Sequence, residues 1–235
     1  MKILLGDPRH STVGAHSYFV PIGIGYIAAN ILNVFKNDKL EVKLSTNPNE
    51  IFDLLENWKP DIIGISNYIW NSGLANVICK KAKEINPNTL CVLGGPEFPA
   101  GTGQRKIENN SLDKTYDKCL EYLVERPSVD YFVWTDGEPA FIEIIDEYKK
   151  HSFSANSLRE KDVTIKGCAS LSKDKKKLNV GEYITRIGTD GSVRAAGRDV
   201  IPSPYTSGLL DKFLDGKYVP AFETARGCPF QCTFC

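Results

Sequence analysis

Three cysteines, Cys228, Cys232 and Cys235, close the sequence at C-x3-C-x2-C spacing. Cubane iron–sulfur clusters are usually held by four thiolates. Three thiolates from one short loop would leave the fourth iron open to a ligand that is not a protein side chain. The spacing therefore predicts a [4Fe-4S] cluster with an open iron, which is suited to chemistry as well as to electron storage.

Zinc binding and disulfide bonding are weaker interpretations of these cysteines. Structural zinc sites usually combine two C-x2-C pairs, or one pair with two histidines, whereas this sequence has a single C-x2-C pair and its three histidines lie far upstream. The seven cysteines are odd in number, and residues 1–5 do not resemble a signal peptide. We therefore expect a reducing, cytoplasmic location and no membrane span.

The charge balance gives no indication of a polyanionic partner. Twenty-nine basic residues are matched by twenty-nine acidic ones, so no overall field favours nucleic acid or an anionic membrane. The one basic run, residues 173–177, is interpreted as a solvated turn between two strands. A length of 235 residues with 42% hydrophobic content suits one or two globular domains.

The first 150 residues alternate short β-branched runs with amphipathic segments of helical period, which is typical of a parallel sheet covered on both faces. Strands are predicted at residues 2–6, 40–44, 61–66, 89–93 and 129–134. Cys79 and Cys91 fall within the core pattern and are expected to be packing residues. This order predicts an α/β fold with a flavodoxin-like (Rossmann-like) doubly wound parallel sheet.

Ligands of such sheets bind beyond the carboxyl ends of the strands, where the winding reverses. The loops after strands one, three, four and five are polar or rich in glycine, and glycine allows the backbone to approach a large planar ligand closely. The candidate binding residues in these loops are Asp7, His10, Gly14, Ser66, Asn67, Gly94, Gly95, Pro96, Glu97, Gly137 and Glu138.

Three domains or segments are expected. Residues 1–150 form the ligand-binding domain, and residues 151–219 form a connector with strands at 165–171 and 183–187 and a short helix at 209–214. Residues 220–235 contain the start of a further domain, with a strand at 219–224 leading into the cysteine loop.

The cysteine loop, with Phe234 just before the third cysteine, resembles the cluster loop of the radical S-adenosylmethionine (SAM) enzymes. The preceding sequence resembles the cobalamin (B12)-binding domain that precedes this loop in one branch of that family. The resemblance extends over the whole chain and rests on residues 21–28, 94–96, 136–139 and 202–205, as well as the cysteines.

The resemblance implies three cofactors: a [4Fe-4S] cluster, SAM chelated by its open iron, and cobalamin. It implies that the cluster loop follows the first strand of a partial β/α barrel, and that a reduced cluster cleaves SAM to a 5′-deoxyadenosyl radical. Methyl transfer to an unactivated carbon is the expected reaction, with an external electron donor and an unidentified small-molecule substrate. Because the barrel would follow Cys235, we expect this chain to be the N-terminal portion of the enzyme and to be inactive alone.

The loop after the first strand departs from the family in one respect. Cobalamin domains that supply an axial histidine carry Asp-x-His-x-x-Gly, whereas two residues separate Asp7 from His10 here, and Gly14 follows four positions later. His10 could still reach a metal, but base-off cobalamin without histidine ligation is the expected form. The alternative function is a flavodoxin-like ligand-binding or regulatory module with a vestigial cobalamin pocket.

Overall fold

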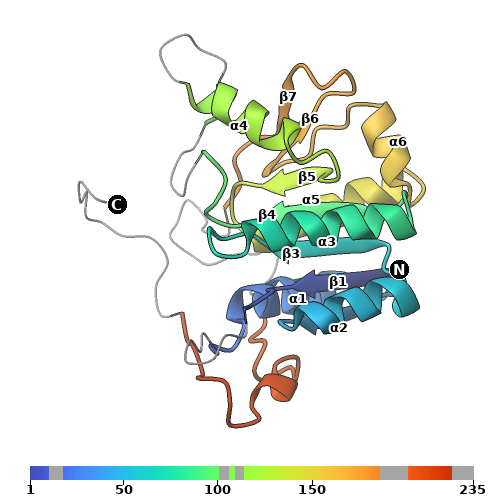
Figure 1. The fold of residues 1–235 in the computed structure, drawn as a ribbon. Coiled ribbons are helices and arrows are strands. Elements are labelled where there is room, and N and C mark those ends of the chain that lie inside the picture. The colour runs from blue at the N-terminus through green and yellow to red at the C-terminus, as the bar shows by residue number, and fades with distance from the viewer. Residues whose placement is uncertain (11–17, 101–105, 109–113, 186–200, 224–235) are drawn as a thin grey trace.

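A computed structural model describes residues 1–10, 18–100, 106–108, 114–185 and 201–223. Seven strands form one sheet in the order β2-β1-β3-β4-β5-β6-β7 (Figure 1). The predicted site residues Gly14, Cys228, Cys232 and Cys235 lie outside the described residues.

The first five strands are parallel, and their order is that of flavodoxin-like sheets. They are β1 (Lys2–Gly6), β2 (Glu41–Ser45), β3 (Ile62–Ser66), β4 (Leu90–Gly94) and β5 (Tyr131–Val133). The strand order reverses between β1 and β3, where the fold class places a ligand. The predicted fold is therefore confirmed, and the strand boundaries differ from the sequence-based ones by only one or two residues.

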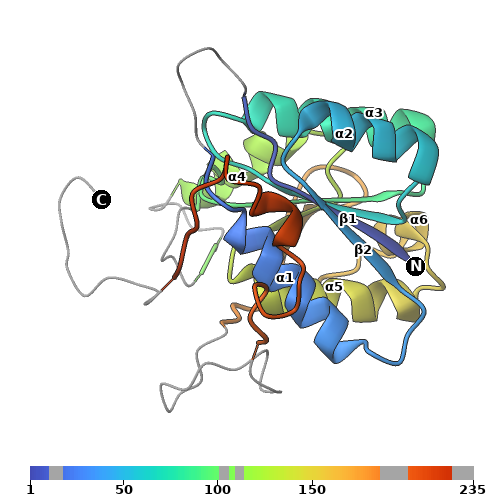
Figure 2. The same ribbon diagram turned by 90° about the horizontal axis from the view of Figure 1, so that it is seen from below.

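Helices cover both faces of the sheet, as Figure 2 shows. One face carries α1 (Ile22–Val34), α5 (Gly137–Lys150) and the short α6 (Ala155–Glu160), and the other carries α2 (Pro48–Asp53), α3 (Ser72–Ile85) and α4 (Thr115–Val124). A five-residue π-helix (Leu54–Trp58) continues α2. Two apolar cores result, because alternate strand residues point to opposite faces: Ile3 and Leu5 join the first core and Leu4 the second.

Residues beyond 150 contribute to the same sheet. Strands β6 (Cys168–Leu171) and β7 (Leu178–Val180) add an antiparallel hairpin to β5. The lysine run at 173–177 forms the turn between them, as predicted. Cys79, Cys91, Cys119 and Cys168 are all buried, in agreement with the packing role expected for the first two.

The second connector strand was predicted at the wrong residues. The backbone N–H of Ser172 donates to the carbonyl of Lys177 (2.9 Å), and this tight hairpin pairs β6 with residues 178–180. The Gly167 N–H donates to the Glu182 carbonyl (2.8 Å). The hydrogen-bonded segment therefore ends before Tyr183. Residues 183–185 have no regular structure, although their composition favours a strand.

The other predicted connector elements are shorter than expected. The helix at 209–214 is a single 3-10 turn (Asp211–Phe213), which buries Leu210 and Phe213 against the α1 face of the sheet. A strand was predicted at 219–224. The described residues of this range, 219–223, form a single parallel bridge, between Val219 and Phe19. Segment 201–223 runs beside α1 (Figure 2), where Gly25 leaves room for Leu210 and Pro204.

Candidate functional site

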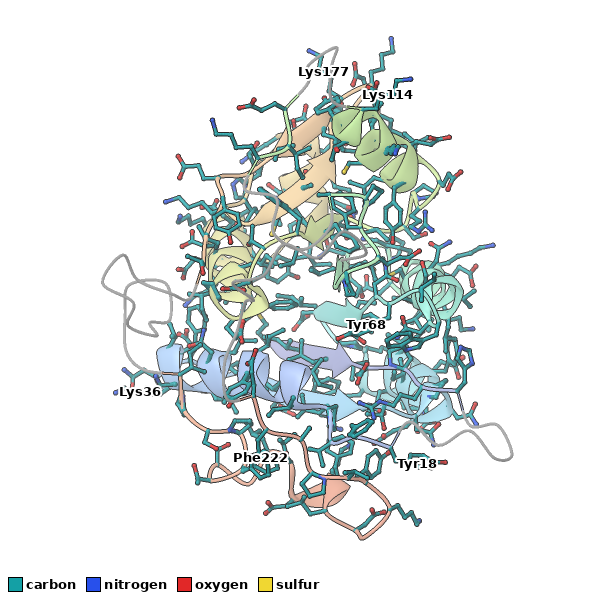
Figure 3. The ribbon with its side chains drawn as sticks, turned by 90° about the vertical axis from the view of Figure 1, so that its left-hand side faces the viewer. Tyr18, Lys36, Tyr68, Lys114, Lys177 and Phe222 are labelled. Carbon is teal, nitrogen blue, oxygen red and sulfur yellow. The ribbon has the colours of Figure 1, made fainter. Side chains whose placement is uncertain are left out.

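A cleft of about 420 Å³ lies at the carboxyl edge of the parallel strands. Figure 3 looks toward this edge, with Tyr68 near its centre. The cleft is bounded by the ends of β1, β3, β4 and β5 and by the first turns of α1 and α5. Six predicted binding residues line it: Asp7, Ser66, Gly94, Gly95, Gly137 and Glu138. The structure thus brings together loops that are separated by up to 130 residues in the sequence.

The base of the cleft is apolar. Leu5, Ile27, Val133 and Phe141 contribute side chains, and Gly64 lies in the middle of β3. A Cβ atom at Gly64 would come within 2.3 Å of the Phe141 ring, so glycine is needed for α5 to pack this closely. These side chains give the cleft an apolar floor, which suits an organic group.

Two glycines allow a close backbone approach at the rim. Gly95 has φ +136°, a conformation that side-chain-bearing residues rarely adopt, and its Cβ would lie 2.5 Å from the Asn67 carbonyl oxygen. A Cβ at Gly137 would lie 2.9 Å from the Ile27 side chain. Gly95 therefore requires glycine, because its Cβ would meet backbone, whereas at Gly137 the added Cβ would meet only the flexible end of the Ile27 side chain.

An ion pair stands at the switch point between β1 and β3. The Arg9 guanidinium lies 2.6 Å from Asp7 Oδ2, and both side chains are largely buried. The Ser66 hydroxyl donates to Asp7 Oδ1 (2.6 Å), and Arg9 also donates to the carbonyl of Phe19. Asp7 is thus satisfied within the protein and orients the Arg9 guanidinium beside the cleft rim.

Tyr68 is held at the cleft by its own loop. Its backbone N–H donates to Asn71 Oδ1 (2.8 Å), and its ring stacks on Trp70 with centroids 4.5 Å apart. Burial raises the pKa of Tyr68, Asp7 raises it further and Arg9 partly offsets the increase. The phenol is therefore neutral at ordinary pH and can donate a hydrogen bond.

Four of the predicted site residues do not line the cleft. His10 is exposed, and its Nε2 lies 2.6 Å from the Trp70 carbonyl, to which it can donate. The Asn67 side chain is buried and donates to the Tyr122 hydroxyl on the α4 side of the sheet. Pro96 and Glu97 follow Gly95 in the same turn but are not among the residues that line the cleft.

The residues missed by the sequence analysis are of two kinds. Arg9 and Tyr68 lie in loops that the sequence had already indicated as part of the binding edge. Their position just after a predicted strand was the signal that could have identified them as lining residues. Gly64 and Phe141 appear in the sequence as ordinary core residues, and only their contact across the sheet and α5 reveals their role. Thr135 directly follows the fifth predicted strand and was also missed.

The cleft residues fit a large, partly flat cofactor. The glycine rim admits a planar group, the floor is apolar, and Arg9, Ser66 and Tyr68 supply polar contacts at the opening. Within the described ranges, no group of three His, Cys, Asp or Glu side chains converges to hold a metal ion.

Residues 12–107 match the family described as "B12 binding domain". The matched region runs from the loop after β1 past the end of β4, so it includes most of the cleft wall. This region is therefore similar to B12-binding domains, and it has the flavodoxin-like fold expected for them.

The relatives of this chain include proteins named as methyltransferases and as a cyclase. The chain is 26% identical over 187 residues to the 2-(S-pantetheinyl)-carbapenam-3-carboxylate methyltransferase of Streptantibioticus cattleyicolor, and 26% identical over 188 residues to the cobalamin-dependent radical SAM methyltransferase TokK of Streptomyces tokunonensis. Each match covers 75% of this chain. An anaerobic magnesium-protoporphyrin IX monomethyl ester cyclase of Rubrivivax gelatinosus is 24% identical over all of this chain.

The matched region is a limited part of each relative. It covers 22% of the two methyltransferases and 38% of the cyclase. The recognition from sequence, a B12-binding domain like that of cobalamin-dependent radical SAM proteins, is confirmed. Within the described residues, none of the helices has the length and apolar character needed to cross a membrane.

Proposed function

We propose that this chain is the N-terminal part of a cobalamin-dependent radical SAM methyltransferase. The observation that carries the proposal is the glycine-rimmed apolar cleft at the switch point of a B12-binding domain. The C-x3-C-x2-C sequence of Cys228, Cys232 and Cys235 supports the radical SAM assignment, with these thiolates holding a [4Fe-4S] cluster. Methyl transfer to an unactivated carbon is favoured because two relatives are named as methyltransferases.

The described residues would bind and orient cobalamin. The apolar floor around Phe141 would favour the corrin ring over water, the glycine rim at Gly95 and Gly137 would lie against the cofactor, and the Arg9 guanidinium would place a positive charge beside it. Cobalamin would supply a transferable methyl group, and the cluster with SAM would supply the radical that activates the substrate. The substrate and the external electron donor would be engaged by the whole protein.

We expect hydroxocobalamin to bind saturably with a base-off absorbance spectrum. His10→Ala should leave that spectrum unchanged and alter the Kd by less than about twofold, because His10 is turned toward the Trp70 carbonyl and is not part of the cleft wall. Anaerobic absorbance titration of both proteins measures this. A bound spectrum that changes with His10→Ala would establish histidine ligation, and absence of binding would favour the vestigial pocket.

Two glycines form a matched pair for testing where the cofactor binds. Gly23 and Gly73 are each the second residue of a helix and are exposed, and a Cβ added at either would meet no atom within 4 Å, but only Gly23 lines the cleft. Gly23→Phe should weaken hydroxocobalamin binding at least tenfold, or about 1.4 kcal/mol, by occupying the cleft mouth. Gly73→Phe should leave the Kd unchanged.

Thermal unfolding of both variants serves as the control, because replacing a helical glycine should preserve or slightly raise stability. Equal Kd values for the two variants would place cobalamin outside this cleft.

A further inference from the structure

Two segments almost 200 residues apart are joined at the mouth of the cleft. We call residues 18–20 and 218–221 together the clasp. The Val20 N–H donates to the Val219 carbonyl (2.9 Å), and the Val219 N–H donates to the Tyr18 carbonyl (2.5 Å). Tyr18 and Phe222 mark the two segments at the bottom of Figure 3. This short parallel pairing therefore attaches the segment before the cysteines to the loop before α1.

Side chains strengthen the second half of the clasp. The Tyr218 hydroxyl lies 2.8 Å from Thr46 Oγ1, next to β2, and the Tyr218 ring packs edge-on against Tyr18 with centroids 5.6 Å apart. The Tyr205 hydroxyl donates to the Ala221 carbonyl (2.7 Å) and accepts from the Ala221 N–H (3.2 Å). These contacts define one closed position for residues 218–221.

The clasp is also a wall of the cofactor cleft. Phe19 and Val20 line the cleft from one segment and Ala221 lines it from the other. Arg9 links this wall to the switch point, because its guanidinium binds both Asp7 and the Phe19 carbonyl. A ligand that fills the cleft therefore contacts both segments only when the clasp is closed.

The pairing between the two segments has few enough contacts to open locally. It consists of a single bridge, and Phe19 and Val219 are each 54% exposed. Segments with few buried contacts open at a free-energy cost well below that of global unfolding. A ligand that contacts only the closed state shifts the equilibrium toward closure, and closure must in turn raise the affinity for the ligand by the same factor.

We propose that the clasp couples cobalamin binding to the position of the cysteine-bearing segment, with Tyr218 as a positioning residue. Cys228 follows Val219 by nine residues in the sequence. Filling the cleft would thereby fix the point from which the chain extends toward the cluster. This inference rests on the proposed function, since cobalamin is the ligand that closes the clasp.

Hydrogen exchange of the Val219 amide tests the coupling directly, because that N–H makes one of the two clasp bonds. Saturating hydroxocobalamin should slow its exchange about tenfold, a typical allosteric factor. The Leu178 amide, which donates to the Tyr116 hydroxyl at β7 (2.9 Å), should not change. Both amides can be followed by NMR in one sample whose absorbance reports the bound cofactor.

Tyr218→Phe and Tyr116→Phe are matched variants, since each removes one hydroxyl hydrogen bond. Tyr218→Phe should speed Val219 exchange about threefold to tenfold without cofactor and weaken hydroxocobalamin binding, whereas Tyr116→Phe should do neither. If hydroxocobalamin gives a bound spectrum but the exchange rate of the Val219 amide is unchanged, the coupling is overturned and the proposed function stands. Absence of a bound spectrum would overturn the proposed function and the coupling with it.

Discussion

Asp130→Ala is expected to lower the free energy of unfolding by about 3–5 kcal/mol, the usual cost of removing one partner from a buried ion pair. The Asp130 side chain is only 3% exposed and lies between two cations, Lys83 (Nζ to Oδ2, 2.5 Å) and Arg159. It also accepts the backbone N–H of Cys91 (2.7 Å). The substitution would leave the buried Cys91 amide without its acceptor and the mostly buried Lys83 ammonium without its anionic partner.

The size of this effect follows from what Asp130 joins. Lys83 belongs to α3, Cys91 to β4 and Arg159 to α6, so one carboxylate connects elements from both faces of the sheet. Lys83 also donates to the Thr89 carbonyl (2.6 Å), which fixes it close to the amino end of β4. The network therefore stabilises the edge of the sheet opposite the cofactor cleft.

Urea denaturation of the wild type and the variant measures the change. The exposed pair between Lys173 and Glu160 provides the control, because such pairs contribute about 0–1 kcal/mol, and Glu160→Ala should have a correspondingly small effect. Equal losses in the two variants would contradict the role assigned to Asp130. Below the unfolding transition, Asp130→Ala should bind hydroxocobalamin as the wild type does.

Replacing Cys228, Cys232 and Cys235 together with alanine is expected to reduce the iron content of the anaerobically reconstituted full-length protein from about four atoms per chain to none. The charge-transfer absorbance of the cluster should disappear with it. The physical reason is that under the proposal these three thiolates would be the protein ligands of the cluster, and no group of three metal-binding side chains lies among the described residues to replace them.

Cys119→Ala is the matched control for thiol removal. Cys119 is fully buried in α4 against the second core, so its loss should lower stability slightly and leave iron content unchanged. Hydroxocobalamin binding should survive the triple substitution, because the cleft is built from other residues. Iron retained by the triple variant would remove the radical SAM part of the proposal, while the B12-binding domain would stand.

The sequence alone predicted the elements whose signals are local. Short β-branched runs with segments of helical period between them identified β1 to β5. The start of α2 is also a local feature, because the side chain of Asn47, just before Pro48, accepts the Asn49 N–H (2.9 Å). The rule that parallel strands present their carboxyl ends at one edge then selected the loops containing Asp7, Ser66, Gly95 and Gly137.

Tertiary contacts decided which side chains of those loops face the cleft. His10 and Asn67 carry the right chemistry, but the Trp70 carbonyl and the Tyr122 hydroxyl, from other loops and helices, engage them elsewhere. The cleft floor at Gly64 depends on how closely α5 packs, and no local pattern reports that distance.

The same difference between local sequence signals and tertiary contacts explains why the elements predicted after residue 150 differ from the observed ones. A short hairpin set the register of β7 and left Tyr183 outside the sheet, although its neighbours have strand propensity. The 219–224 segment found a single partner, Phe19, 200 residues away in the sequence. Periodicity and motif spacing are properties of consecutive residues, so the sequence by itself determined the fold class, the binding edge and the cysteine motif. Side-chain direction and long-range pairing depend on packing between distant segments, and only the tertiary structure decided them.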